Sequence, residues 1–153
     1  MRHKKEILQS RFWKFWDNIL EKLRSENGCI VVEGIHDAKI LTNLGTPLEQ
    51  IVIIGGYSIE KVANIIHDRY SSAYIFTDFD RRGNQKAQKL LSMLTSRGVK
   101  TIDLRKFFLE HFSSLGFKSV GKIEELKTFS EVIPRPNTAI IKYLRKIMST
   151  SSP

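Results

Sequence analysis

The chain has 153 residues, the usual size of one compact domain with a buried core. Its 25 basic and 16 acidic residues give a formal charge of +9, which favours an anionic partner such as nucleic acid, although membrane surfaces attract the same charge. Cys29 is the only cysteine, which excludes an intramolecular disulfide and a Cys-rich zinc site. Since neither a membrane span nor a signal-peptide pattern is visible, we expect a complete cytoplasmic protein with no membrane partner.

The first predicted element is an amphipathic helix over residues 3–26. Its apolar residues recur at steps of three and four until Asn27-Gly28 ends the pattern. Such a stripe can lie on a membrane or receive a partner, but packing against the chain's own domain is the favoured interpretation. Trp13 lies just off the stripe and is the residue most open to another role.

The next part of the chain alternates short apolar runs with helical patterns. The runs have the length of buried strands and cover residues 29–33, 51–54, 73–78 and 101–104. The helical patterns cover residues 37–43, 58–70 and 84–97. Ser58 is a candidate N-cap for the second of these helices. The alternation predicts an α/β, Rossmann-like fold: a mainly parallel four-stranded sheet with right-handed crossovers and helices on both faces.

Beyond residue 105 the pattern predicts further helices, with a turn at residues 133–137. These helices are expected at residues 107–115, 123–129 and 138–148. The predicted organisation is an N-terminal helix (1–27), a sheet core (28–105) and C-terminal helices packed on the core (106–153).

Three carboxylates follow predicted strands. Glu33 ends the first strand, and Asp78 with Asp80 ends the third. Ligands of an open parallel sheet bind beyond the carboxyl ends of the strands, so the topology is expected to bring these side chains to one edge. If residues 77–80 continue the strand, the alternation of side chains along it places Asp78 and Asp80 on the same face. Because like charges this close repel, a divalent ion such as Mg²⁺ is expected between them. The alternative is that an aspartate only caps the following turn or helix.

A basic segment follows the aspartates directly. Residues 81–100 hold six basic and no acidic residues: Arg81, Arg82, Lys86, Lys89, Arg97 and Lys100. Acidic groups beside a basic helix are typical of a site where a metal ion meets a phosphate backbone. A solvated basic helix face is the alternative.

The stretches "VVEGIHDAKIL", "IIGG" and "IFTDFDRRG" together resemble the Toprim domain. This module is shared by type IA and type II topoisomerases, bacterial-type primases, overcoming-lysogenization nucleases and the 5S ribosomal RNA maturation nucleases. The resemblance covers residues 28–105. It implies that Glu33 acts as general acid or base, and that Glu33, Asp78 and Asp80 bind Mg²⁺ or Mn²⁺.

The resemblance also implies roles for the glycines of these motifs and for a further acidic residue. The backbone is expected to turn tightly at four glycines: Gly34, Gly55, Gly56 and Gly83. Asp37 matches an acidic position of the primase and maturation-nuclease branches, although an N-cap role for it is equally open.

Two positions depart from the family pattern. Type IA topoisomerases carry another acid where this chain has Arg82, which predicts one well-held ion rather than two. The maturation nucleases have a lysine where this chain has Ile35, and His36 or Lys39 are the candidates to replace it. A topoisomerase is set aside because its tyrosine nucleophile is presented from a separate large domain.

The leading hypothesis is a stand-alone, primase-like Toprim protein that hydrolyses phosphodiester bonds of nucleic acid, as an RNA- or DNA-processing nuclease. Four basic residues would hold the phosphate backbone: Arg81, Arg82, Lys86 and Lys89. The alternative is a metal-binding and nucleic-acid-binding adaptor that needs a protein partner for chemistry.

Overall fold

A computed structural model describes residues 2–78, 80–107 and 147. The elements are α1 (Arg2–Ser25), β1 (Gly28–Val32), α2 (Ile35–Asn43), the 3-10 helix η1 (Leu48–Gln50), β2 (Ile51–Ile53), α3 (Ile59–Arg69), β3 (Ser72–Ile75), α4 (Arg81–Ser96) and β4 (Lys100–Asp103). Within this part of the chain the strands form one four-stranded sheet in the order β2-β1-β3-β4, and every pair is parallel. The predicted α/β class and parallel sheet are confirmed.

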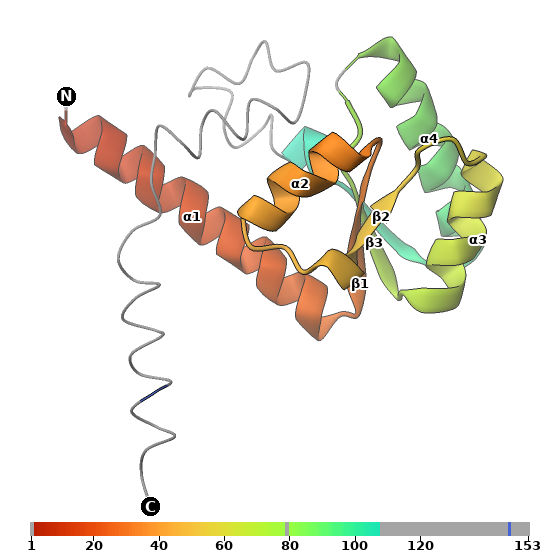
Figure 1. Cartoon of the computed structure of the whole chain (residues 1–153), viewed down its shortest axis with the longest axis horizontal. Helices are drawn as coiled ribbons and strands as arrows, with labels where there is room; N and C mark the ends of the chain where they lie inside the picture. The colour runs from red at the N-terminus through yellow and green to blue at the C-terminus, as the bar shows by residue number, and fades with distance from the viewer. Residues whose placement is uncertain (1, 79, 108–146, 148–153) are drawn as a thin grey trace, which may run out of the picture.

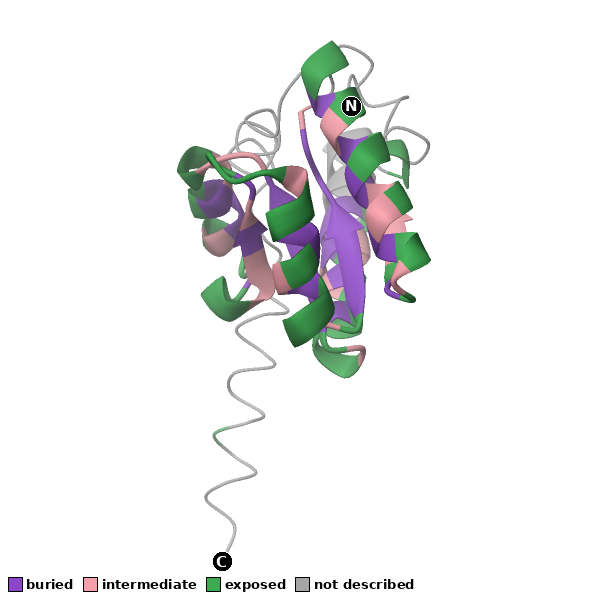
Figure 2. Ribbon diagram, turned by 90° about the vertical axis from the view of Figure 1, so that its right-hand side faces the viewer, coloured by how far each residue is buried: buried purple, intermediate pink, exposed green. Residues whose placement is uncertain are grey.

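The sheet lies between two layers of helices, α1 and α2 on one side and α3 and α4 on the other (Figure 1). Alternation along β1 explains both layers, since successive side chains of a strand point to opposite faces. Ile30 and Val32 pack in the core with α1 and α2, whereas Cys29 and Val31 pack in the core with α3 and α4. Figure 2 shows the exposed outer surfaces of the helices, and burial is complete along the two central strands, β1 and β3. Burial raises the pKa of the Cys29 thiol to about 12, so this cysteine stays protonated and unreactive at neutral pH.

The long helix α1 is part of the domain core. Phe12, Trp16 and Leu23 are fully buried, and Trp13 is only 6% exposed. The Trp16 Nε1–H also donates a hydrogen bond of 2.9 Å to the Leu44 carbonyl, which joins α1 to the end of α2. Trp13 therefore belongs to the core and not to a separate surface.

The structure corrects three predicted boundaries near the sheet edge. β3 ends at Ile75 rather than at residue 78, so the expected strand alternation through Asp78 and Asp80 is wrong. α4 begins at Arg81 rather than at residue 84, because Asp80 has extended backbone angles and caps the helix. α2 likewise begins at Ile35, two residues before the predicted start.

The C-terminal helices predicted beyond residue 105 lie outside the described residues, except that residues 104–107 and 147 are helical. None of the helices in the described part of the chain has the length and apolar character needed to cross a membrane.

Replacing Trp16 with Ala tests whether α1 helps to hold the domain together. The change removes a fully buried indole and leaves the Leu44 carbonyl without its donor, so the free energy of unfolding should fall by about 3–5 kcal/mol. Lys14→Ala, at an exposed position of the same helix, is the control and should change it by less than about 0.5 kcal/mol. Urea unfolding measures the two free energies. Equal losses in the two variants would contradict the role of α1 in holding the domain together.

Candidate functional site

Glu33 lies at the carboxyl edge of the sheet, directly after β1. Its carbonyl accepts a 2.9 Å hydrogen bond from the Gly55 amide, which ties the end of β1 to the loop after β2. The side chain is half-buried, and its Oε1 atom is buried without a hydrogen-bond partner. Such an oxygen is costly to bury unless a cation or donor satisfies it.

Asp78 reaches the same edge from the neighbouring strand β3. The Thr77 hydroxyl donates a 2.9 Å hydrogen bond to the Gly83 carbonyl, which folds the loop back onto the first turn of α4. A Cβ atom on Gly83 would lie 2.0 Å from the Asp78 carbonyl oxygen. Only glycine fits at position 83, and the contact fixes the backbone of Asp78 against α4.

The Asp78 carboxyl acts electrostatically on Glu33. Burial is the main cause that raises the pKa of Glu33, and the negative charge of Asp78 adds to the rise. The closeness of the Asp78 carboxyl and the more weakly acting charge of Asp80 act in the same direction, whereas the charge of Lys86 opposes them. The sheet edge thus holds a crowded carboxyl pair with one unsatisfied buried oxygen, which is the donor chemistry that a hard divalent cation prefers.

Asp80 stands apart from this pair in its bonding. Its Oδ1 atom accepts a 2.7 Å hydrogen bond from the Gly83 amide, so one of its oxygens caps α4. In the described residues, no group of three or more His, Cys, Asp or Glu side chains is arranged as a metal site. The structure therefore brings Glu33 and Asp78 together and gives Asp80 the capping role that was the alternative in the sequence.

The basic residues predicted to bind phosphate lie between the first residue and the middle of α4. Arg81, Arg82 and Lys89 are exposed, and Lys86 is half-buried and close enough to act on the pKa of Glu33. The opposite face of α4 is anchored in the core by Ala87, Leu90 and Leu94. The helix therefore presents cations beside the carboxyl pair.

The position of Asp37 in α2 differs from the N-cap position that was one of its two expected roles. Gly34 is the N-cap of α2, and Asp37 is its third residue, whose Oδ2 accepts a 3.2 Å hydrogen bond from the Gly34 amide. Asp37 thus caps the helix from within and is not its N-cap. His36 and Lys39 are exposed on the same helix.

The four motif glycines have different structural reasons. Gly55 has a positive φ of 55°, which favours glycine, and Gly83 is required by its contact with Asp78. Gly34 has an extended φ of −144°. A Cβ on Gly56 would meet no atom within 4 Å. Gly55 and Gly56 lie in the turn that the hydrogen bond from the Tyr57 amide to the Ile54 carbonyl closes, whereas Gly83 lies in the first turn of α4 and Gly34 is the N-cap of α2.

Arg105 is a residue of this region that the sequence analysis missed. Arg105 is buried, with 6% of its surface exposed, and its guanidinium donates to both carboxylate oxygens of Asp103 at 3.0 Å. It also donates to Asn84 Oδ1 at 2.6 Å and, over a longer 3.4 Å, to the Asp78 carbonyl. Arg105 thus connects the end of β4 with α4 and the Asp78 loop. No sequence signal links Arg105 to Asp78, because the two residues are 27 positions apart.

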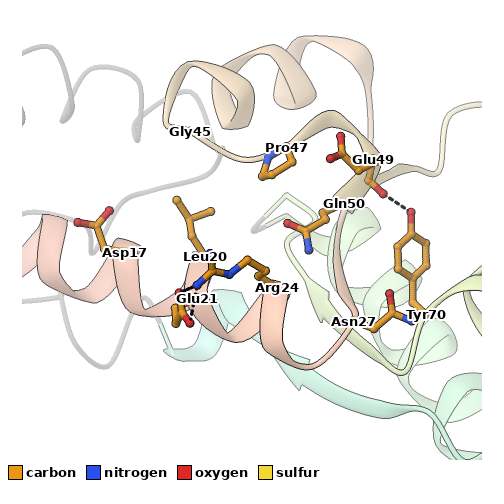
Figure 3. A pocket seen from close by; sticks show the side chains of 10 residues that line it. All are labelled: Asp17, Leu20, Glu21, Arg24, Asn27, Gly45, Pro47, Glu49, Gln50 and Tyr70. Carbon is orange, nitrogen blue, oxygen red and sulfur yellow. Dashed lines mark hydrogen bonds and ion pairs between the residues drawn. The ribbon is translucent and has the colours of Figure 1, made fainter. Parts of the chain in front are cut away.

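The hollow shown in Figure 3 lies at the other edge of the sheet, where Asn27, Gln50 and Tyr70 precede the strands. Its volume is about 520 Å³. The Arg24 guanidinium on its wall pairs with Glu21 at 2.6 Å. None of the predicted site residues lines this hollow, so it is separate from the carboxyl edge.

A parallel sheet whose carboxyl edge carries an acidic pair and a basic helix defines an α/β domain of the Toprim class. Residues 30–107 match the Toprim-like family. The chain therefore belongs to this family, and the predicted resemblance is confirmed.

The chain is also similar to UPF0292 proteins of archaea and, in fold, to a solved structure. The chain is 39% identical over 115 residues to a UPF0292 protein of Thermococcus gammatolerans, a match that covers 74% of this chain and 82% of the relative. A UPF0292 protein of Thermococcus onnurineus is 38% identical over 54% of this chain and 60% of its own length. A solved Aquifex aeolicus protein, 23% identical, has the same fold with a TM-score of 0.59, over 73% of this chain and 95% of its own.

Arg105→Lys tests whether the guanidinium holds the Asp78 loop. Lysine keeps the charge but cannot make the forked contacts, so we expect a loss of about 2 kcal/mol in stability. Amide hydrogen exchange should become faster at residues 77–84 and stay unchanged in α3. Lys106→Ala, at the exposed neighbouring position, is the control. Uniform exchange changes over both regions would contradict a specific role for Arg105.

Proposed function

We propose that this protein processes nucleic acid as a nuclease that depends on Mg²⁺ or Mn²⁺. The observation that carries the proposal is the buried, unpartnered Oε1 of Glu33 beside Asp78, next to the cationic start of α4. Structural carboxylates in this position would be expected to find a donor, and functional sites are where such unsatisfied groups persist.

In this proposal the carboxyl edge holds the ion through Glu33 and Asp78, with Asp80 as a third ligand. When bound, the ion would polarise a phosphate of the substrate and neutralise the charge that develops on it. Glu33 would also handle the proton of the attacking or leaving oxygen, as general acid or base. The helix cap formed by Asp80 would keep the start of α4 in place beside the ion.

The cations of α4 would bind the phosphate backbone. Arg81, Arg82 and Lys89 are exposed and free to contact phosphates, while Lys86 is held closer to the carboxyl pair. Contacts of this kind position a substrate without reading its sequence. The formal charge of +9 supports the same kind of partner.

A second candidate function is a binding module that needs a partner protein for chemistry. The capping role of Asp80 favours it, because that carboxylate already uses one oxygen within the fold. Such a module would bind nucleic acid through α4 and would not cut it.

A cleavage assay tests the proposal. The purified protein is incubated with end-labelled structured RNA, single-stranded DNA and duplex DNA, each with Mg²⁺, Mn²⁺ or EDTA. We expect cleavage of at least one substrate only with metal, and a rate at least about 100-fold lower for Glu33→Gln and Asp78→Asn.

Asp68→Asn is the matched control, because Asp68 is an exposed carboxylate near the C-terminal end of α3. It should cleave at the wild-type rate. Cleavage that persists in both site variants would contradict the proposal. Tight binding without cleavage by the wild type would favour the binding module.

A further inference from the structure

Tyr57 is an exposed aromatic side chain in the loop that follows β2, at the carboxyl edge of the sheet. It is 55% exposed and lies in the loop between β2 and α3. Its amide donates a 3.1 Å hydrogen bond to the Ile54 carbonyl, and the neighbouring Gly55 amide is bonded to the Glu33 carbonyl. The backbone that carries the Tyr57 ring is therefore fixed to Glu33, the residue that follows β1.

The other tyrosines of residues 2–78 and 80–107 have structural partners. The Tyr70 hydroxyl donates to the Glu49 carbonyl at 2.5 Å, and the Tyr74 hydroxyl donates to Glu26 at 3.1 Å. Tyr57 is contacted instead by a cation, since Lys61 Nζ lies 4.5 Å from the centre of its ring. An aromatic ring with an adjacent ammonium group is a combination that suits a nucleobase and its phosphate.

The strand order sets the sequence of chemical groups along the sheet edge. β2 lies beside β1, and β1 lies beside β3, so Tyr57, Glu33 and Asp78 follow one another across the edge. Two strand spacings, roughly 10 Å, separate β2 from β3. α3 and α4 pack in the same core cluster and both begin at this edge, so Lys61 and the arginines of α4 start from the same side of the sheet.

A nucleic-acid strand that crosses this edge would meet an aromatic ring, then the carboxyl pair, then cations. Stacking on the ring requires an unpaired base, because bases inside a duplex already stack on their neighbours. The hydroxyl of Tyr57 is not needed for stacking, since every base presents a π-face to a ring.

We propose that Tyr57 stacks an unpaired nucleobase and makes this edge a binding site for single-stranded nucleic acid. The inference rests on the proposed function, because it takes the carboxyl edge as the place where nucleic acid binds. It adds the substrate class: a single strand, or an unpaired segment of a folded one.

The test is equilibrium binding in EDTA, so that binding is measured without cleavage. The probes are a fluorescein-labelled 12-nucleotide oligothymidine, an abasic strand of the same length and a 12-base-pair duplex. Wild type should bind the oligothymidine about tenfold more tightly than the abasic strand. Tyr57→Ala should remove this preference by weakening only the binding of oligothymidine, and Tyr57→Phe should keep it.

Leu48→Ala is the matched control, because Leu48 is an exposed apolar side chain, 67% exposed, that precedes β2 at the opposite edge. It should leave both affinities unchanged. Arg82→Ala should weaken the binding of both single strands, since a phosphate contact does not depend on the base.

The outcomes separate this inference from the proposed function. A base preference that survives Tyr57→Ala, or equal losses on both strands, overturns the stacking role even where metal-dependent cleavage is found. A preference that Tyr57→Ala abolishes supports the role even where no cleavage occurs. Absence of binding to every probe overturns it, and would make a protein the better candidate for the partner of this edge.

Discussion

The crowding of Glu33 and Asp78 is the constraint on which the candidate site depends. β1 and β3 are hydrogen-bonded neighbours in a parallel sheet, so the residues that follow them emerge side by side at the carboxyl edge. Two carboxyl groups in this position repel, and burial of one Glu33 oxygen without a donor adds to the cost. A fold selected only for stability would have little reason to keep this arrangement. A bound cation would convert the repulsion into attraction, and the surrounding structure is built to keep the carboxyl groups where that can happen.

Several contacts hold the Asp78 loop in one position. Gly83 allows the backbone of α4 to approach Asp78 closely, and the Thr77 hydroxyl bonds to the Gly83 carbonyl on the same side. Asp80 caps α4, and Arg105 joins the loop to the end of β4. Each contact restrains the backbone of the Asp78 loop. None of them uses the Asp78 carboxyl, which lies at the edge of the sheet with Glu33. A site that must bind an ion and a phosphate needs supports of this kind, because small displacements of the ligands weaken binding.

Much of this fold could be predicted from the sequence, because apolar periodicity distinguishes short buried strands such as 29–33 from helices such as 58–70. The error at the end of β3 has a local cause. The apolar run through Phe76 continues the strand pattern in the sequence. In the structure β3 ends at Ile75, and Asp80 caps α4 instead of extending the strand. Arg105 and Tyr57 were missed for other reasons. The contacts of Arg105 join residues far apart in the chain, and the exposure of Tyr57 is set by the loop that carries it.

Binding of Mn²⁺, followed by electron paramagnetic resonance, tests the central claim that the carboxyl pair is a cation site. Wild type should bind one ion per chain, and Glu33→Gln and Asp78→Asn should each weaken binding at least about tenfold. Each variant should unfold at or above the wild-type temperature, because it removes charge repulsion rather than a packing contact. Asp68→Asn should bind as wild type does. Equal Mn²⁺ binding by wild type and both site variants, or no binding by the wild type, would contradict the account.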